Sequence, residues 1–318
     1  MPPDRANMRV DFLRRGDEKA RTNATGAIHH PTRIVSFRLD RFEMKFVVTA
    51  EQRAALIERL SPELRPDENA GGSACYPVVS LYYDSDARDC HWERVRGLGS
   101  RRKLRVRVYG SADGRVAPLA FVEVKQKCDG RGVKRRVRLP LEHALDVGRG
   151  LRPEGVCLSE WDCRLIEEVH GLVRHRGFKP VMVMRYDRSA YASIDPASDL
   201  RITFDTGIFC RMENLMPEPD DRRFDSRHEM HPDGRAVMEL KITGCIPYGL
   251  SRTIAAAGCT LQSHSKYSNA LEQIDSVLRA TPATGWRREV PDEGGTKTET
   301  LRTGSQPFAE SAGRPAIA

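Results

Sequence analysis

Lysines and arginines recur at every second position along several stretches of this 318-residue chain. The run Lys103-Leu-Arg-Val-Arg107 places its three cations on one side of an extended strand. Further cations with apolar neighbours are Lys125, Lys127, Lys134, Arg136, Arg138, Arg185, Arg188 and Arg201. A guanidinium donates two parallel charge-assisted hydrogen bonds to phosphate oxygens, and a lysine adds a point charge. The pattern therefore predicts a binding site for a polyanionic phosphate.

A few carboxylates accompany these cations and are candidate metal ligands. Glu239 is the strongest candidate, because it shares one face of a predicted strand with Lys241. Glu43 and Glu123 occupy similar positions. Hard cations such as Mg²⁺ and Mn²⁺ prefer oxygen ligands from carboxylates and phosphates, so one of these metals is the expected cofactor. For Glu43 and Glu123, ion pairing with neighbouring lysines is an equally good explanation.

Cations, a metal and a confined site suffice for phosphoryl transfer, because they neutralise developing charge and hold donor and acceptor in line. The glycine pairs Gly71-Gly72 and Gly97-x-Gly99 lack the P-loop pattern, which disfavours a Walker-type NTPase. No H-E-x-x-H motif occurs, and the eight cysteines form no C-x-x-C pair. The cysteines are therefore expected to be reduced thiols of a cytosolic protein.

Period-two alternation predicts eight strands, which must position these side chains. The expected strands are 38–48, 76–84, 101–109, 121–127, 132–139, 181–188, 200–205 and 236–243. Helices are expected after the N-cap Thr49, with Gln52 at capping-box spacing, and over 160–176 after the N-cap Ser159. Two more are expected at 247–257 and 265–279. The fold class is therefore α+β.

The direction of the cationic faces decides the function. Each could be the solvated outer face of an ordinary sheet. Repetition over several strands, each with a strongly apolar opposite face, instead favours a barrel with an inward cationic lining, and about eight strands leave room for one small ligand. An outer basic stripe with exposed stacking aromatics would indicate a nucleic-acid binder. The aromatics mostly lie on the apolar faces, so no nucleic-acid partner is expected.

Composition sets the boundaries of this body. Residues 1–35 and 281–318 are polar and lack hydrophobic periodicity, so both are expected to be disordered around a folded body at 36–280. The formal charge of +8 suits an anionic partner. No apolar run approaches the roughly 20 residues of a membrane span. The first residues lack the apolar region of a signal peptide, so a cytoplasmic location is expected.

Nine signatures in order carry a family resemblance. They are Arg41-Phe-Glu-Met-Lys45, Tyr82-Tyr-Asp84, Lys103-Leu-Arg-Val-Arg107-x-Tyr109, Glu123-Val-Lys-x-Lys127, Lys134-Arg-Arg136, Tyr186-x-Arg188, Leu200-Arg-Ile-Thr-Phe-Asp205, Met238-Glu-Leu-Lys241 and Ser265-Lys-Tyr267. The chain resembles the VTC domain, the polyphosphate polymerase domain of the vacuolar transporter chaperone complex. That domain belongs to the CYTH-like superfamily of triphosphate tunnel metalloenzymes.

The resemblance implies an antiparallel eight-stranded β tunnel with flanking helices. The tunnel would bind ATP and polyphosphate and, with Mn²⁺ or Mg²⁺, transfer the ATP γ-phosphate to the growing chain. The expected catalytic residues are Lys45, Arg105, Arg107 and Arg201. The expected phosphate-binding residues are Lys103, Lys125, Lys127, Lys134, Arg136, Arg188, Lys241 and Lys266. The expected metal ligands are Glu239, Glu43 and Glu123.

Two positions depart from relatives of the family. Hydrolases and cyclases of the superfamily open with E-x-E-x-K, whereas this chain has Arg41 at the first acidic position. This substitution favours a polymerase, with a tripolyphosphate or nucleoside triphosphate hydrolase and a non-catalytic polyphosphate-binding module as alternatives. Eukaryotic members carry a further lysine where this chain has Ser263.

Overall fold

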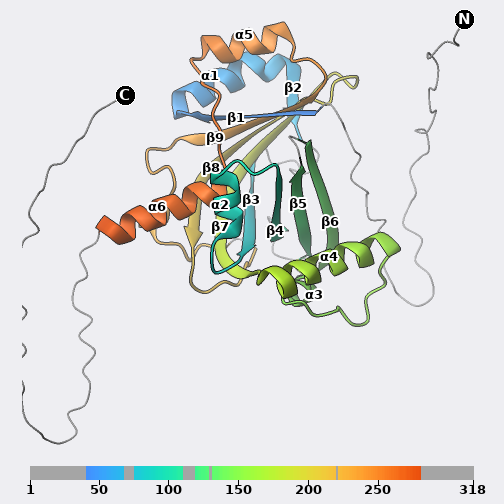
Figure 1. Ribbon diagram of the computed structural model, residues 1–318. Coiled ribbons are helices and arrows are strands. Elements are labelled where there is room, and N and C mark those ends of the chain that lie inside the picture. The colour runs from blue at the N-terminus through green and yellow to red at the C-terminus, as the bar shows by residue number, and fades with distance from the viewer. Residues whose placement is uncertain (1–40, 68–74, 110–118, 129–130, 220, 281–318) are drawn as a thin grey trace, which may run out of the picture. The chain divides into compact units, whose positions relative to one another are not determined.

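The computed structural model describes residues 41–67, 75–109, 119–128, 131–219 and 221–280 (Figure 1). The tails expected to be disordered, 1–35 and 281–318, and the first residues of the expected strand 38–48 lie outside this range. A compact unit extends to Leu278, and the description below concerns this unit alone.

The strands form one antiparallel sheet. Its order is β1-β9-β8-β7-β3-β4-β5-β6, and the short β2 pairs with β7. The strands are β1 Arg41–Val48, β2 Leu64–Pro66, β3 Cys75–Asp84, β4 Ser100–Tyr109, β5 Leu119–Cys128, β6 Arg131–Pro140, β7 Lys179–Ser193, β8 Arg201–Arg211 and β9 Ala236–Thr243. All eight expected strands are present, and β7 and β8 are longer than expected.

Helices flank this sheet. They are α1 Ala50–Leu60, α2 Asp89–Val95, α3 Leu141–Gly148, α4 Glu160–Arg176, α5 Tyr248–Ala256 and α6 Lys266–Ala280. Capping boxes begin two of them: Thr49 with Gln52 at α1, and Ser159 with Asp162 at α4. Both N-caps were predicted, whereas α2 and α3 were not.

Two apolar clusters fix the outer faces. Under α1 and α5, outward side chains of β1, β8 and β9 such as Phe46, Ile202 and Met238 are buried. Under α3 and α4, outward side chains of β4 to β6 such as Leu104 and Val122 are buried. Figure 1 shows these two helix pairs at opposite ends of the sheet. These outward side chains lie behind the sheet, so the side chains that alternate with them face the concave side.

The sheet curls strongly. Strands β1 and β5 are separated by five strands in hydrogen-bonding order. Nevertheless, Lys125 Nζ on β5 lies 3.3 Å from Glu43 Oε2 on β1. The concave faces of the two sheet ends therefore meet across a lumen. The predicted antiparallel eight-stranded α+β architecture is confirmed, with the lumen bounded by a curled half-barrel.

Candidate functional site

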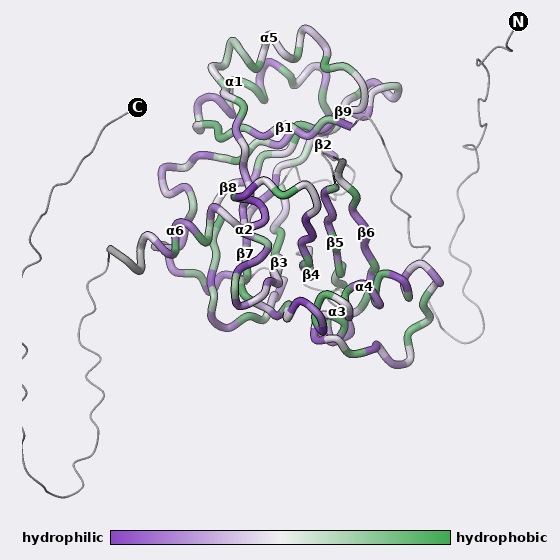
Figure 2. The backbone as a smooth tube through the Cα atoms, viewed as in Figure 1, coloured by the Kyte–Doolittle hydropathy of each residue, from purple (hydrophilic) through white to green (hydrophobic). Residues whose placement is uncertain are grey.

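Cations stand directly opposite one another on β4, β5 and β6. Lys103 pairs in register with Lys125, which pairs in turn with Lys134. Figure 2 shows hydrophilic residues along these three strands. Like charges in directly opposed positions destabilise a sheet. This part of the lumen therefore gains stability from any anion that binds there.

Glu123 lies between two cations of the lumen, Arg105 and Lys134. Its side chain is 1% exposed, accepts a 2.6 Å hydrogen bond from Arg105 Nε and forms an ion pair with Lys134. Burial opposes its charge, but Arg105 and Lys134 hold the pKa of Glu123 well below its ordinary value. Burial also lowers the pKa of Lys134 to about 7, although Glu123 partly offsets this effect. The structure thus shows Glu123 as an ion-pair partner, the alternative explanation that the sequence allowed.

Arg107 is buried in the lumen, at 5% exposure. Its guanidinium donates to Ser80 Oγ at 3.1 Å and to the Tyr186 hydroxyl at 3.0 Å. Both acceptors are neutral, and within the described ranges no carboxylate lies within ion-pair distance of this guanidinium. A buried, permanently charged group in this situation is compensated when an anionic ligand binds beside it.

Asp205 holds two further cations. Arg188 donates to both of its oxygens, at 2.6 and 2.8 Å, and Lys266 Nζ lies 2.5 Å away. Asp205 is fully buried, yet Lys266 and Arg188 overcome the cost of burial and lower its pKa to about 2. Lys266 is the first residue of α6, so this helix begins at the lumen.

Lys45 joins the two carboxylates proposed for metal binding. Its ammonium lies 3.2 Å from Glu43 and 3.5 Å from Glu239, and Lys241 lies 3.0 Å from Glu239. Burial opposes the charge of Lys45, but Glu239 and then Glu43 raise its pKa. Glu239 is 7% exposed, and Lys241 and Lys45 hold its pKa well below the ordinary range despite burial.

The same residues test whether a divalent metal fits. Within the described ranges no three His, Cys, Asp or Glu side chains gather closely enough to hold an ion. Glu43 and Glu239 can provide two oxygen donors, whereas Glu123 is occupied by Arg105 and Lys134. Mg²⁺ commonly binds through one or two carboxylates together with substrate phosphates. The donor set therefore fits a metal that arrives with its phosphate ligand.

The segment before α6 crosses one end of the lumen. Lys45 Nζ donates to the His264 carbonyl at 3.3 Å, and Lys103 Nζ donates to Ser265 Oγ at 2.9 Å. Burial lowers the pKa of Lys103 to about 8, with a further contribution from the nearby charge of Arg94. Arg94 on α2 also donates to the Ser263 carbonyl at 3.3 Å. Strand alternation gave no signal for Arg94, because this cation comes from a helix.

Some predicted residues lie towards the ends of the lumen. Arg201 donates to Asp67 at 2.5 Å, and the Arg136 guanidinium lies 4.7 Å from the ring centroid of Phe121. Lys127 is exposed at the end of β5. Arg185 does not belong to the lumen. It pairs in register with the outward residue Val79, because it alternates along β7 with the lumen residues Tyr186 and Arg188.

The placement of aromatics differs from the prediction. Tyr82 and Tyr186 face the lumen, where their hydroxyls accept hydrogen bonds from Arg105 and Arg107. Tyr109 lies on the lumen face as well, because it follows Arg107 by two positions on the same strand. The expectation that the aromatics lie on apolar faces is therefore wrong for these tyrosines. Period-two spacing from the cations was the signal that could have placed them.

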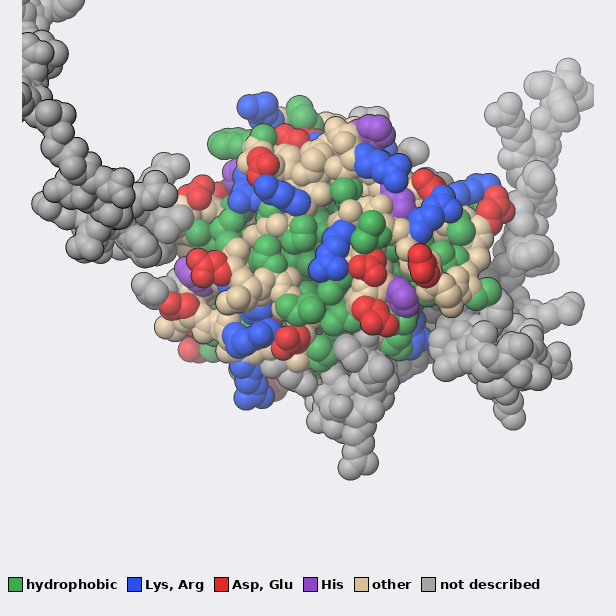
Figure 3. All heavy atoms as spheres, turned by 90° about the horizontal axis from the view of Figure 1, so that it is seen from below, with side chains coloured by type: hydrophobic (Ala, Val, Ile, Leu, Met, Phe, Trp, Pro, Cys, Tyr) green, Lys and Arg blue, Asp and Glu red, His purple; other side chains and the backbone are tan. Residues whose placement is uncertain are grey.

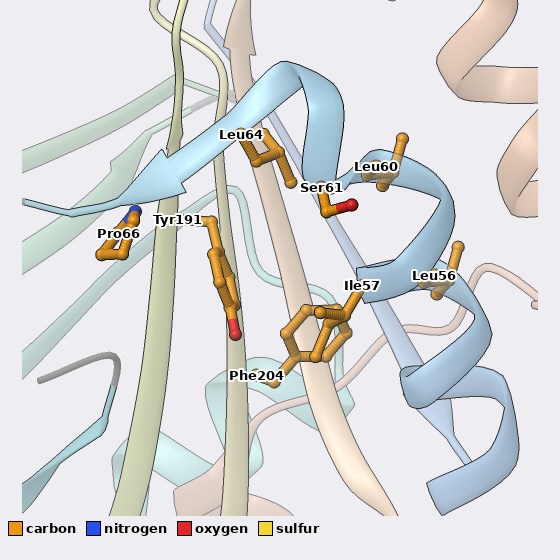
Figure 4. Close-up of a pocket in the computed structure, with 8 residues that line it drawn as sticks. All are labelled: Leu56, Ile57, Leu60, Ser61, Leu64, Pro66, Tyr191 and Phe204. Carbon is orange, nitrogen blue, oxygen red and sulfur yellow. The ribbon is translucent and has the colours of Figure 1, made fainter.

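One further pocket within the described residues differs from the lumen in character. A pocket behind β7 and β8 is lined by apolar side chains of α1 and the sheet, including Leu56, Leu60, Tyr191 and Phe204 (Figure 4). It has no charged group to hold phosphate. On the face shown in Figure 3, described Lys and Arg side chains are scattered among acidic and apolar ones. In the described parts, no helix is long and apolar enough to cross a membrane.

The sequence matches the family model of the VTC domain over residues 40–274. The chain belongs to the VTC domain family. Membership confirms the resemblance carried by the nine signatures and supports a function in handling polyphosphate or triphosphate. No curated protein matches the chain.

Several solved structures are similar to this VTC domain protein. A candidate adenylyl cyclase from Hippeastrum, described as having a dominant triphosphatase activity, has 16% identity and a TM-score of 0.43 over 73% of this chain and 95% of its own. A candidate adenylate cyclase from Bacillus halodurans has 12% identity and a TM-score of 0.41, covering 71% and 94%. A third, from Vibrio parahaemolyticus, has 12% identity and a TM-score of 0.35, covering 73% and 98%.

Proposed function

We propose that this VTC domain protein is an ATP-dependent polyphosphate polymerase. It transfers the γ-phosphoryl group of ATP to the terminal oxygen of a polyphosphate chain within the lumen. The bond from the γ-phosphorus to the β–γ bridging oxygen breaks, and a new bond forms to the chain. ADP leaves, and the chain grows by one phosphate.

Arg107 is the observation that carries this proposal. Its guanidinium is nearly inaccessible to solvent, and its described hydrogen-bond partners, which include Ser80 and Tyr186, are hydroxyl groups and not carboxylates. A phosphate chain supplies the missing negative charge and accepts the N–H groups that remain free. Arg105 lies on the same strand face, and Arg188 is nearby in the same lumen, so a chain that reaches Arg107 meets further cations.

Each part of the lumen has a proposed role. The proposed catalytic residues Arg105, Arg107 and Arg201 bind the phosphates of ATP along the lumen, and Lys45 orients the carboxylates beside them. Lys103, Lys125, Lys127 and Lys134 bind the chain on the β4–β6 side. Arg136, Arg188, Lys241 and Lys266 complete the phosphate contacts. Fixed cations of this kind stabilise the charge that develops during transfer without reorganisation.

A divalent metal is part of the proposal. Glu239 and Glu43 would hold Mn²⁺ or Mg²⁺, with phosphate oxygens and water as the remaining ligands. The metal would neutralise charge on the phosphates when bound. Glu123 remains the third carboxylate proposed from the sequence, and its two ion pairs make it the least available. A cytoplasmic location also remains a proposal.

Product analysis with ATP and Mn²⁺ or Mg²⁺ tests the polymerase. We expect ADP and an acid-stable long phosphate chain in equal phosphate equivalents, and we expect Glu239→Gln to lower the rate strongly. Glu168→Gln is the matched control, because Glu168 also binds two arginines but lies outside the lumen on α4. Release of orthophosphate alone would identify a hydrolase, and tight binding without turnover would identify a binding module. Either result overturns the polymerase.

A further inference from the structure

Three aromatic rings gather at one end of the lumen. Tyr76, Tyr109 and Phe121 lie at the ends of β3, β4 and β5, on the face that carries Arg107. The ring centroids of Tyr76 and Tyr109 are 6.1 Å apart, and those of Tyr109 and Phe121 are 5.7 Å apart. All three side chains are only partly buried. We call this group the aromatic end.

Cations border the aromatic end. The Arg136 guanidinium lies over the Phe121 ring, at 4.7 Å from its centroid. Arg201 approaches the Tyr76 hydroxyl at 3.5 Å. Aromatic faces with a guanidinium alongside are the features on which proteins stack nucleobases, while the phosphates bind neighbouring cations.

The opposite end of the same strands has a different character. Lys103, Lys125 and Lys127 lie there, with Arg94 close to Lys103. Tyr109 follows Lys103 on β4 by six positions, which corresponds to about 20 Å of extended strand. We call this the cationic end. A ligand with one aromatic group and a polyanionic tail matches the lumen in a single direction.

We propose that the aromatic end binds the base of a nucleoside triphosphate, so that its phosphates point past Arg107 towards the cationic end. This inference rests on the proposed function, because it assigns the direction in which ATP lies in that lumen. The γ-phosphate then faces Lys103 and Lys125, and the growing chain occupies the cationic end. Tyr76 and Tyr109 pack in part against the apolar core, yet all three rings retain exposed surface, and Arg136 and Arg201 lie beside them.

Paired binding measurements test the base site. Dissociation constants for ATP and for inorganic tripolyphosphate are measured for wild type, Tyr109→Leu and Phe121→Leu. Each leucine variant is expected to bind ATP about tenfold more weakly, because stacking contributes about 1–3 kcal/mol per base. Tripolyphosphate, which has no base, is expected to keep its affinity. Phe121→Tyr retains a ring and should restore ATP binding.

Trp161→Leu is the control, since Trp161 is an exposed aromatic on the outer helix α4. Equal weakening of both ligands, or of neither, overturns the base site. A measurement on the wild-type protein does not depend on whether the variants fold. In saturation-transfer NMR, saturating the tyrosine and phenylalanine ring protons should transfer saturation to the adenine protons of bound ATP. Absence of that transfer overturns the inference. If wild type binds no tripolyphosphate, the proposed function itself fails, and the base site fails with it.

Discussion

Replacing Glu123 with glutamine should destabilise the protein when no phosphate is present. The carboxylate is 1% exposed and lies between Arg105, at 2.6 Å, and Lys134. Glutamine keeps the size and one acceptor oxygen but removes the charge. Arg105 and Lys134, whose side chains are 23% and 35% exposed, then lose their shared counter-charge.

The size of the expected loss in stability depends on how Arg105 and Lys134 respond to the missing charge. Removing one partner of a buried ion pair costs about 3–5 kcal/mol. Lys134 can lose its proton, because its pKa is already about 7 and falls further without Glu123. Arg105 cannot lose its proton, so the lower end applies, about 3 kcal/mol. For a domain of this size, that lowers Tm by about 6–12 °C.

Tripolyphosphate should reduce this deficit. A bound anion replaces the lost carboxylate, and its attraction to one additional uncompensated cation about 8 Å away is about 2 kcal/mol at an effective dielectric constant of 20. Urea denaturation with and without saturating tripolyphosphate measures both values. Glu168→Gln is the matched control, because Glu168 also lies between two arginines, Arg102 and Arg135. Its stability deficit should not shrink when tripolyphosphate is added.

Two results would refute the reasoning. Stability equal to wild type would mean that Arg105 and Lys134 are adequately solvated without Glu123. A deficit that stays the same with tripolyphosphate would mean that the ligand does not bind beside these cations. The pH dependence provides a further check. Because the folded-state pKa of Glu123 lies below its ordinary value of 4.5, its contribution is present above pH 4.5 and is lost as the pH falls below it.

Three further changes have defined outcomes. Lys134→Arg should flatten the decline in tripolyphosphate affinity between pH 6 and 8 relative to wild type. The reason is that Lys134, with a pKa near 7, loses its charge over that range, whereas arginine does not. Arg94→Gln should weaken long-chain polyphosphate binding about twofold to fivefold while ATP binding, measured in parallel, changes little. Arg41→Glu should increase orthophosphate release from tripolyphosphate, because it adds a carboxylate on the face of Glu43, and Arg41→Gln separates this gain from the loss of the arginine.

Local patterns in the sequence were sufficient for most of the fold. Alternation predicted all eight long strands, and the capping box at Thr49 and the N-cap at Ser159 predicted α1 and α4. Helices α2 and α3 lack these signals. The N-cap of α2 is Arg88, which has a left-handed backbone and no side-chain cap bond, and the N-cap of α3 is Pro140. Packing against the sheet specifies these helices, and a single sequence does not display that packing.

The sequence predicted which types of side chain line the candidate site, but not which of them contact one another. The inward direction followed from cations repeating opposite apolar faces, as at Lys103 and Leu104. The contact of Lys125 with Glu43 depends on curling of the whole sheet, which no local pattern encodes. Arg94 comes from an unpredicted helix, and the lumen tyrosines were missed although they share the spacing of the cations.

The described lumen repeats one electrostatic unit, in which a buried carboxylate lies between two cations. Glu123 has Arg105 and Lys134, and Asp205 has Arg188 and Lys266.

The third unit of this kind is centred on Glu239, which lies between Lys45 and Lys241. Each unit keeps a net positive charge, so the acids fix the positions of the cations without neutralising them. This arrangement restricts metal binding, because an ion at Glu239 must displace at least one of its two ammonium groups. Phosphate provides a new partner for the displaced lysine as well as further oxygens for the metal. Metal and phosphate are therefore expected to bind together, with each weakening when the other is withheld.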